Sequence, residues 1–312
     1  MKLLVLGAGV LGSLLADELL RAGHTVSILA RGPRYETLVE QGLVLRHYLQ
    51  GKTTCTQPHV IHNTGEEGGV YDAVFCVLQY TQLHDALGTL SKMDAGLYVL
   101  IGNNPDPDAA RACFTEHGGD ADKLLFAFLG AGGRRENGKI VVIHKKRISL
   151  TAGALSGGET GKQILESTLA DSNVRLCWET DIRAWLLYHL ALVVPAASAI
   201  YAVDGRLGAL ARDKQLLNTM ILAVREAMAG LEHTGIRHEA TQKALEVSDR
   251  KLMRLMRILL LTPLGRLMAG DHAMSAKAEM AALGAALDTR LLGEAQERME
   301  HYLFLKAFDP KV

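Results

Sequence analysis

The first twelve residues place a strand directly before a glycine-spaced turn, and this arrangement constrains the fold more than any other feature of the chain. Residues 1–6 (MKLLVL) are apolar, as in a buried strand, and the run GAGVLG follows without a gap. The amphipathic residues 13–21 (SLLADELLR) predict that the chain continues as a helix. A G-x-G-x-x-G turn between a strand and a helix is typical of a βαβ unit that binds a dinucleotide.

Each part of this turn has a predicted role of its own. Gly7 permits the tight turn, Gly9 lets a pyrophosphate approach the backbone because it has no Cβ, and Gly12 lets the helix lie close to the strand. The first turn of the helix offers free N–H groups to the phosphate charge. The alternative is a turn that serves packing alone. We expect cofactor contacts from five residues of the turn: Gly7, Gly9, Val10, Leu11 and Gly12.

The residue after the second strand predicts which dinucleotide binds. Residues 25–30 (TVSILA) read as that strand, and NAD sites carry an acidic residue at its end to bind the ribose 2′-hydroxyl. This chain has Arg31 there, with Arg34 three residues further on. A guanidinium group forms charge-assisted hydrogen bonds to a 2′-phosphate but gains nothing equivalent from a neutral hydroxyl. The sequence therefore favours NADP(H), and the alternative is a solvated surface arginine.

Composition excludes several classes of protein. The chain has 312 residues, of which 48% are apolar and 22% charged, so it can form two domains with separate cores. Its 34 basic and 34 acidic residues give no net charge, so no overall field recruits nucleic acid or an anionic membrane. The four cysteines show no C-x-x-C spacing, and we expect neither a metal site nor a disulfide framework.

The first residues of the chain and its interrupted apolar stretches predict a cytoplasmic protein. The first residues read as a strand of the fold and not as a signal peptide. Two apolar stretches, residues 185–203 and 252–268, approach the length of a membrane span. Polar or charged residues and a proline interrupt both of them, so we expect no membrane-spanning helix.

The order of apolar runs predicts an α/β fold with an N-terminal Rossmann-type, doubly wound sheet followed by an all-helical C-terminal domain. Strand-like runs at residues 71–78, 96–101 and 124–129 alternate with helical ones, which indicates a mainly parallel sheet. We expect residues 139–144 and 147–151 to finish that sheet as an antiparallel pair, before a helix at 159–169 and a strand at 174–178. From residue 181 the pattern is helical throughout. The predicted domains are residues 1–180 and 181–312.

Seven segments, in this order, resemble the ketopantoate reductase (2-dehydropantoate 2-reductase) family: GAGVLG, Arg31, VLQYTQ, LIGNN, RRENGKIVVIH, DIRAWLLYHLA and LMAGDHAMSAKAE. The resemblance implies an NADPH-binding domain and a helical substrate domain. It also implies that Asn103 contacts the substrate and the nicotinamide ribose, and that Glu279 assists the catalytic acid and binds substrate. Gln79 takes the position of a family lysine that lies near the cofactor phosphates and the substrate.

The chain departs from the family pattern at the catalytic acid. The family has a proton-donating lysine in the first helix of the second domain, and here the alignment puts either His189 or Leu187 on that position. Two substrate-binding positions, an asparagine and a serine in the family, are matched by Val193 and Leu267. A pocket that has lost such hydrogen bonds discriminates against the parent substrate. We therefore expect a substrate other than ketopantoate.

Carbonyl reduction needs a proton donor and groups that stabilise the developing alkoxide. His189 is the candidate acid, Glu279 its candidate carboxylate partner and Asn103 the candidate hydrogen-bond donor. The alternative is that His189 is a core histidine. Three functions remain open: an NADPH-dependent reductase of a 2-oxo acid or related carbonyl, a catalytically silent NADPH-binding sensor, and an opine-type dehydrogenase that uses His189 as its acid. The expected partners are a small-molecule substrate and a second copy of the chain.

Overall fold

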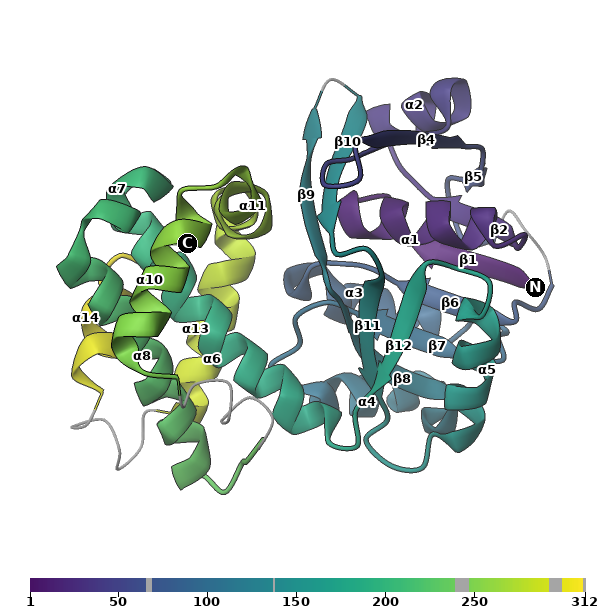
Figure 1. Ribbon diagram of the computed structural model, residues 1–312. Coiled ribbons are helices and arrows are strands. Elements are labelled where there is room, and N and C mark those ends of the chain that lie inside the picture. Colours follow the sequence, from purple (N-terminus) through teal and green to yellow (C-terminus); the bar gives the residue numbers. More distant parts are fainter. Residues whose placement is uncertain (66–68, 137, 239–246, 292–298, 311–312) are drawn as a thin grey trace. The chain divides into compact units, whose positions relative to one another are not determined.

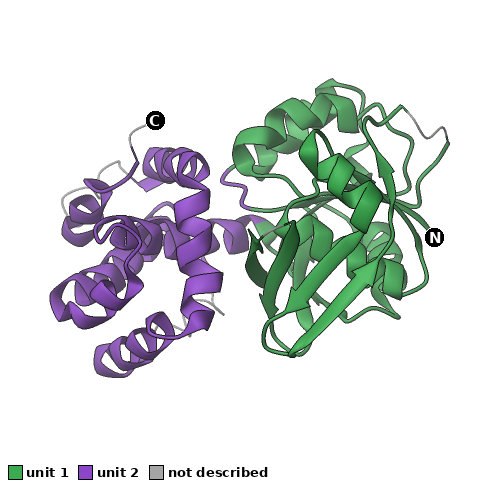
Figure 2. Cartoon of the chain, turned by 90° about the horizontal axis from the view of Figure 1, so that it is seen from above, with its two compact units in different colours: residues 1–102, 106–182 green, residues 103–105, 183–312 purple. Residues whose placement is uncertain are grey.

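The computed structural model describes residues 1–65, 69–136, 138–238, 247–291 and 299–310. The chain forms two compact units, which Figure 2 shows in separate colours. One unit consists of Met1–Gly102 and Asp106–Ile182, and the other of Asn103–Pro105 and Arg183–Val312. The main division thus falls two residues from the position predicted from the change in sequence pattern.

An eight-stranded sheet forms the centre of the first unit, in the order β12-β11-β8-β7-β6-β1-β2-β5 (Figure 1). Neighbouring strands are parallel except for β8 and β11, which are antiparallel. The central strands β6 and β7 are buried along their whole length, and β1 and β8 at all but one residue, as their apolar sequences predict. The strands are β1 (Lys2–Leu6), β2 (Thr25–Leu29), β5 (His59–Ile61), β6 (Ala73–Cys76), β7 (Tyr98–Ile101), β8 (Leu124–Leu129), β11 (Ile148–Gly153) and β12 (Val174–Trp178).

Helices connect these strands and confirm the Rossmann-type arrangement. In α4, the Asp106 carboxylate accepts a hydrogen bond from the Ala109 N–H and Pro107 occupies the first turn, so the sequence itself sets where the helix begins. The helices of this unit are α1 (Val10–Arg21), α2 (Pro33–Gln41), α3 (Tyr80–Leu90), α4 (Pro107–Glu116) and α5 (Glu159–Leu169), with a 3₁₀ turn, η1, at Ala121–Lys123.

A second, four-stranded sheet has the order β4-β3-β10-β9 and was not predicted. Its strands are β3 (Leu43–His47), β4 (Lys52–Thr56), β9 (Ala131–Glu136) and β10 (Lys139–His144). The expected pairing of residues 139–144 with 147–151 is wrong. Strand β10 pairs antiparallel with β9 and parallel with β3, whereas β11 pairs with β8 and β12 in the large sheet. The short connection between β10 and β11 passes from one sheet to the other instead of closing a hairpin.

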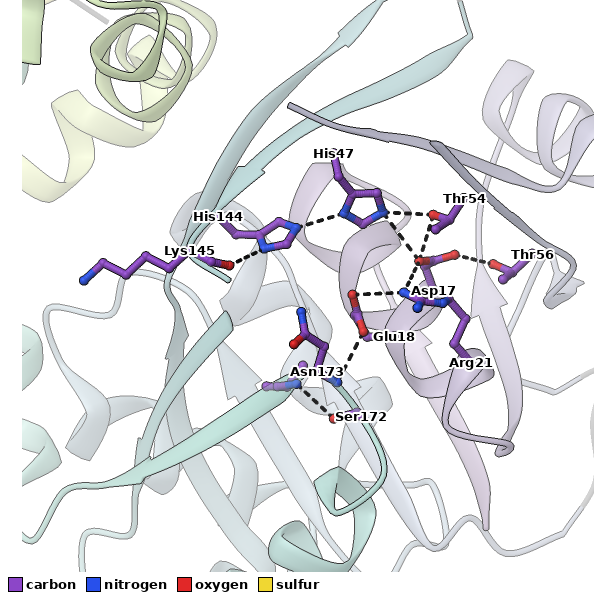
Figure 3. A network of polar contacts seen from close by, with 11 residues as sticks. Asp17, Glu18, Arg21, His47, Thr54, Thr56, His144, Lys145, Ser172 and Asn173 are labelled. Carbon is purple, nitrogen blue, oxygen red and sulfur yellow. Dashed lines mark hydrogen bonds and ion pairs between the residues drawn. The ribbon is translucent and has the colours of Figure 1, made fainter. Parts of the chain in front are cut away.

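Helix α1 packs against strands of both sheets, and a buried polar network joins it to the small sheet (Figure 3). His47 Nδ1 lies 2.9 Å from His144 Nε2, and His47 Nε2 lies 3.0 Å from the Thr54 hydroxyl. Asp17 of α1 accepts hydrogen bonds from Thr54 at 3.0 Å and from Thr56 at 2.8 Å. Because these groups are hydrogen-bonded to one another, their burial costs less than it would for isolated polar groups.

The second unit is helical, which confirms the predicted change of pattern. Helix α6 has the length and apolar content that a membrane span would need, but 67% of its most apolar window is buried inside the protein, as in the core helix of a globular unit. The helices are α6 (Ile182–Tyr201), α7 (Leu207–Arg212), α8 (Lys214–His233), α10 (Asp249–Leu260), α11 (Pro263–Gly265), a π turn, η2, at Arg266–Gly270, α12 (Asp271–Ser275), α13 (Lys277–Leu291) and α14 (Glu300–Lys306).

Candidate functional site

Two glycines of the first turn are required by packing within the protein. Gly7 has φ +109°, a conformation that side-chain-bearing residues rarely adopt, and a Cβ there would collide with the Val77 carbonyl oxygen. A Cβ on Gly12 would collide with the carbonyl oxygen of Gly7. These contacts hold strand β1, the turn and helix α1 close together.

Gly9 differs, because nothing in the protein itself requires a glycine there. Its φ of −73° suits any residue, and no atom lies within 4 Å of the place that a Cβ would occupy. Gly9 precedes α1, has no side-chain cap, and is followed by a first helical turn without an acidic residue. Open space above a helix N-terminus is where a pyrophosphate binds in a dinucleotide site. The geometry of Gly9 therefore fits a phosphate-bearing ligand.

A cavity of about 710 Å³ lies in front of this turn. Its walls include residues 6–9 at the end of β1, 29–31 at the end of β2 and 77–79 after β6. The carboxyl ends of these three adjacent parallel strands form the position where open α/β sheets bind their ligands. Of the predicted cofactor residues, the cavity brings together Gly7, Gly9, Arg31 and Gln79. Val10, Leu11 and Gly12 form the first turn of α1.

Three arginines line the same cavity: Arg31, Arg34 and Arg135. Arg31 is exposed at the end of β2, whereas Arg34 is partly buried. Burial, and after it the charge of Arg135, lowers the pKa of Arg34 to about 10, so the group is still cationic at pH 7. Arg135 could not be assigned to the cofactor site from the sequence, because its place here depends on the unpredicted small sheet that contains β9.

Asn103 follows β7 and belongs, by its contacts, to the helical unit. Its side chain is 7% exposed, and its Oδ1 atom is buried without a hydrogen-bond partner among the described residues. A buried acceptor left unpaired costs about 1 to 3 kcal/mol. Such an atom is explained when a ligand supplies the missing donor.

The candidate acid His189 lies on α6, where its ring stacks on Trp185 with centroids 5.2 Å apart and planes inclined by 6°. Burial, and after it the charge of His272, lowers the pKa of His189 to about 4, so the imidazole is neutral at pH 7. The other residue that aligns with the family lysine, Leu187, is fully buried. A proton donor at His189 therefore needs an anionic group beside it to favour the charged form.

Glu279, on α13, is 3% exposed. Its negative charge adds to burial and to Asp309 in raising the pKa of Tyr201, whose hydroxyl donates to the Ala273 carbonyl at 2.7 Å. Leu267, on the position of the family serine, is buried in the π turn. The pairing of Glu279 with His189 stays a prediction.

The fold, the glycine turn and the cavity are those of a dinucleotide-binding protein of Rossmann type, and a family match supports the class of NAD(P)-dependent oxidoreductases. Residues 3–150 match the family described as ketopantoate reductase PanE/ApbA. These residues make up just under half of the chain, and their similarity to this family fits a divergent relative. A sequence search of curated proteins found no match.

Solved structures show the same fold over nearly the whole chain. A D-mandelate dehydrogenase in complex with NADH and anilino(oxo)acetate is 15% identical, with a TM-score of 0.74 over 99% of this chain and 96% of that one. A PanE/ApbA family ketopantoate reductase from Ralstonia eutropha JMP134 is 17% identical, with a TM-score of 0.74 over 99% and 98%. A 2-dehydropantoate 2-reductase from Methylococcus capsulatus is 17% identical, with a TM-score of 0.68 over 100% and 99%. At these identities the likeness establishes the fold alone.

Proposed function

We propose that this protein is an NADPH-dependent reductase of a 2-oxo acid or a related carbonyl compound other than ketopantoate. The observation that carries the proposal is the cavity at the glycine turn, where Arg31 takes the place of the acidic residue that would bind a ribose 2′-hydroxyl. The open space at Gly9 supports a phosphate-bearing cofactor. The match of residues 3–150 to the ketopantoate reductase family supports the reaction class.

The choice of NADPH over NADH is tested by binding. We expect NADPH to bind more tightly by about 1 to 3 kcal/mol, the scale of a charge-assisted contact to the 2′-phosphate. Arg31→Ala should remove most of this difference. Calorimetric or fluorescence titration of both cofactors measures it. The similar D-mandelate dehydrogenase was solved with NADH, and equal affinities in the unmodified protein would contradict our choice of cofactor.

The proposed substrate class rests on the similarity to the family and on the loss of polar substrate-binding residues in this chain. The similar D-mandelate dehydrogenase was solved with anilino(oxo)acetate, whose oxo group lies next to a carboxylate. In this chain Gln79, Val193 and Leu267 stand where ketopantoate reductases have a lysine, an asparagine and a serine. A site built on hydrogen bonds loses specificity for its substrate when these partners are replaced. We expect ketopantoate to be a poor substrate and a 2-oxo acid with a more apolar side chain to be a better one.

Steady-state assays that follow NADPH absorbance with a panel of 2-oxo acids and ketones test this choice. A kcat/KM for ketopantoate of about 10⁴ M⁻¹s⁻¹ or more, which is ordinary for an enzyme on its own substrate, would contradict the exclusion of ketopantoate.

The proposed chemistry assigns one task to each residue. A bound nicotinamide supplies the hydride. Asn103 Oδ1 accepts a hydrogen bond from a ligand hydroxyl, because it is a buried acceptor without a partner among the described residues. His189 delivers the proton to the developing alkoxide, and the carboxylate of a 2-oxo acid favours its charged form. Glu279 assists the acid.

A catalytically silent NADPH-binding sensor is the second candidate. The low pKa of His189 favours the sensor. A neutral imidazole has a proton on only one ring nitrogen, and it is not the imidazolium acid that would protonate an alkoxide. Under this function the protein binds NADPH but oxidises it with no carbonyl compound of the panel. Turnover that His189→Ala lowers by about 10²- to 10⁴-fold would exclude the sensor and support the reductase.

A further inference from the structure

Arg34 and Arg135 hold two guanidinium groups against one backbone carbonyl of the glycine turn. Arg34 Nε donates to the Ala8 oxygen at 3.3 Å, and Arg135 Nη2 donates to the same oxygen at 3.1 Å. Two cations that share one acceptor repel each other, and this repulsion contributes to the lowered pKa of Arg34. An anion placed between them would relieve the repulsion.

The protein does not supply that anion from the residues that the structure describes. Among the described residues, no ion pair joins Arg34 or Arg135 to a carboxylate. The adjacent Arg134 shows the contrast, because its Nη2 lies 3.0 Å from Glu136 Oε2 and it is not among the residues that line the cavity. The two neighbouring arginines of β9 thus differ in charge compensation and in position.

The hydrogen bonds of Arg34 fix its orientation. Besides Ala8, it donates from Nη2 to the Ser13 hydroxyl at 3.2 Å and from Nη1 to the Gly138 carbonyl at 3.4 Å. Arg135 uses one of its five N–H donors in the contact that the structure gives for it. The remaining donors of Arg135 are available to a ligand in the cavity that both side chains line.

The position of these groups matches the adenosine end of a dinucleotide. In this fold the ribose 2′ position lies at the end of the second strand, where Arg31 follows β2 and lines the same cavity. A phosphate dianion accepts several hydrogen bonds at once, and the planar guanidinium group presents paired donors to it. We propose that Arg135, reaching over from the small sheet, is a specificity-determining residue that binds the 2′-phosphate of NADP(H) together with Arg34. This inference rests on the proposed cofactor.

The test compares two adjacent arginines of one strand. Arg135→Gln and Arg134→Gln are titrated with NADPH, NADH and 2′,5′-ADP, the last of which carries the 2′-phosphate without a nicotinamide. For Arg135→Gln we expect affinity for NADPH and for 2′,5′-ADP to fall about tenfold or more, and affinity for NADH to change less than about twofold. Arg134→Gln should behave like the unmodified protein with all three ligands.

Other outcomes overturn the proposal. Equal weakening of NADPH and NADH would place Arg135 on a part of the cofactor that both share, and an unchanged NADPH affinity would show that it binds no phosphate. Arg135→Lys, with circular dichroism as the check on folding, replaces Arg135→Gln if that variant unfolds. It keeps the charge but loses the paired donors, so NADPH affinity should fall and NADH affinity should not.

The proposed function can fail separately. An unmodified protein that binds neither dinucleotide would overturn the proposed function and this inference with it. A clear preference for NADPH that survives in Arg135→Gln would overturn this inference alone.

Discussion

His47 and His144 face each other from two adjacent parallel strands of the small sheet, with Nδ1 of the first 2.9 Å from Nε2 of the second. Both side chains are buried, and the planes of their rings are nearly perpendicular. One imidazole must accept the hydrogen that the other donates, so two imidazolium rings cannot form this contact. The pair therefore holds β3 and β10 together only while at least one ring is neutral.

We predict that His47 makes the protein less stable in acid. Burial, and then the charges of His144, Lys52 and Arg21, lower the pKa of His47 to about 4, whereas an unfolded chain has the ordinary value of 6.5. The unfolded state then binds more protons between these values, so stability is full above pH 6.5 and is lost as the pH falls toward 4. The difference between the two pKa values corresponds to a loss of about 3 kcal/mol in the free energy of unfolding.

Urea unfolding at pH 7, 6, 5 and 4 measures this loss. His189 has a similarly lowered pKa and also makes the free energy of unfolding depend on pH. The contribution of His47 is therefore the difference in this pH dependence between the unmodified protein and His47→Gln. The exposed His59, replaced in the same way, is the control and should keep the full slope. An identical slope in His47→Gln would contradict the prediction.

Substitution of Gly9 should affect cofactor binding, whereas substitution of Gly12 should affect the stability of the fold. Gly9→Ala places a methyl group in open space, so we expect little change in unfolding free energy but a loss of NADPH affinity of roughly tenfold or more. Gly12→Ala drives a methyl group into the Gly7 carbonyl and should cost about 3 kcal/mol of stability or more. Thermal unfolding and cofactor titration on both variants measure the two effects. Gly9→Ala with normal NADPH affinity would show that no phosphate approaches this residue.

Asn103 should show a conflict between stability and function. Asn103→Leu removes the unpaired buried oxygen at similar volume, so we expect the free energy of unfolding to stay equal or to rise by about 1 kcal/mol. The variant should bind NADPH more weakly or turn over more slowly, because the acceptor for the ligand is gone. Chemical denaturation and single-turnover assays test both halves. A variant that is destabilised and fully active would show that Asn103 is structural.

If His189 donates the proton, kcat/KM for carbonyl reduction should rise as the pH falls. Its pKa of about 4 in the free protein means that the fraction in the acid form grows about tenfold for each pH unit from 8 to 5. Short assays across this range measure the slope, which His189→Ala should abolish. By contrast, Glu279→Gln should lower the pKa of the acid further and shift the profile to lower pH. A flat profile in the unmodified protein would assign the acid to another group.

Much of the large sheet could be predicted because its strands are short apolar runs between helices. Residues 124–129, 159–169 and 174–178 were assigned with the bounds that the structure gives to β8, α5 and β12. Residues 124–129 are a short continuous apolar run, as in a strand buried on both faces, and in residues 159–169 the buried leucines lie at helical spacing.

The small sheet could not be predicted for a physical reason. Strand β4 (KTTCT) has no aliphatic side chain, and its inward-facing groups are the Thr54 and Thr56 hydroxyls that bond to Asp17. An apolar periodicity cannot reveal a strand whose buried face is polar. The position of Arg135 at the cavity could not be predicted either, because its contact with Ala8 joins residues 127 positions apart.

The hydrogen bond between Ala8 and Arg135 joins the glycine turn before α1 to strand β9 of the small sheet. A ligand that contacts both residues connects the glycine turn to the β9–β10 hairpin. Any opening of that hairpin must then release the ligand, so the free energy of binding is added to the cost of opening. Backbone amides of β9 and β10 should therefore exchange their hydrogens with solvent more slowly as the cofactor concentration rises, although the strands themselves lie in a separate sheet.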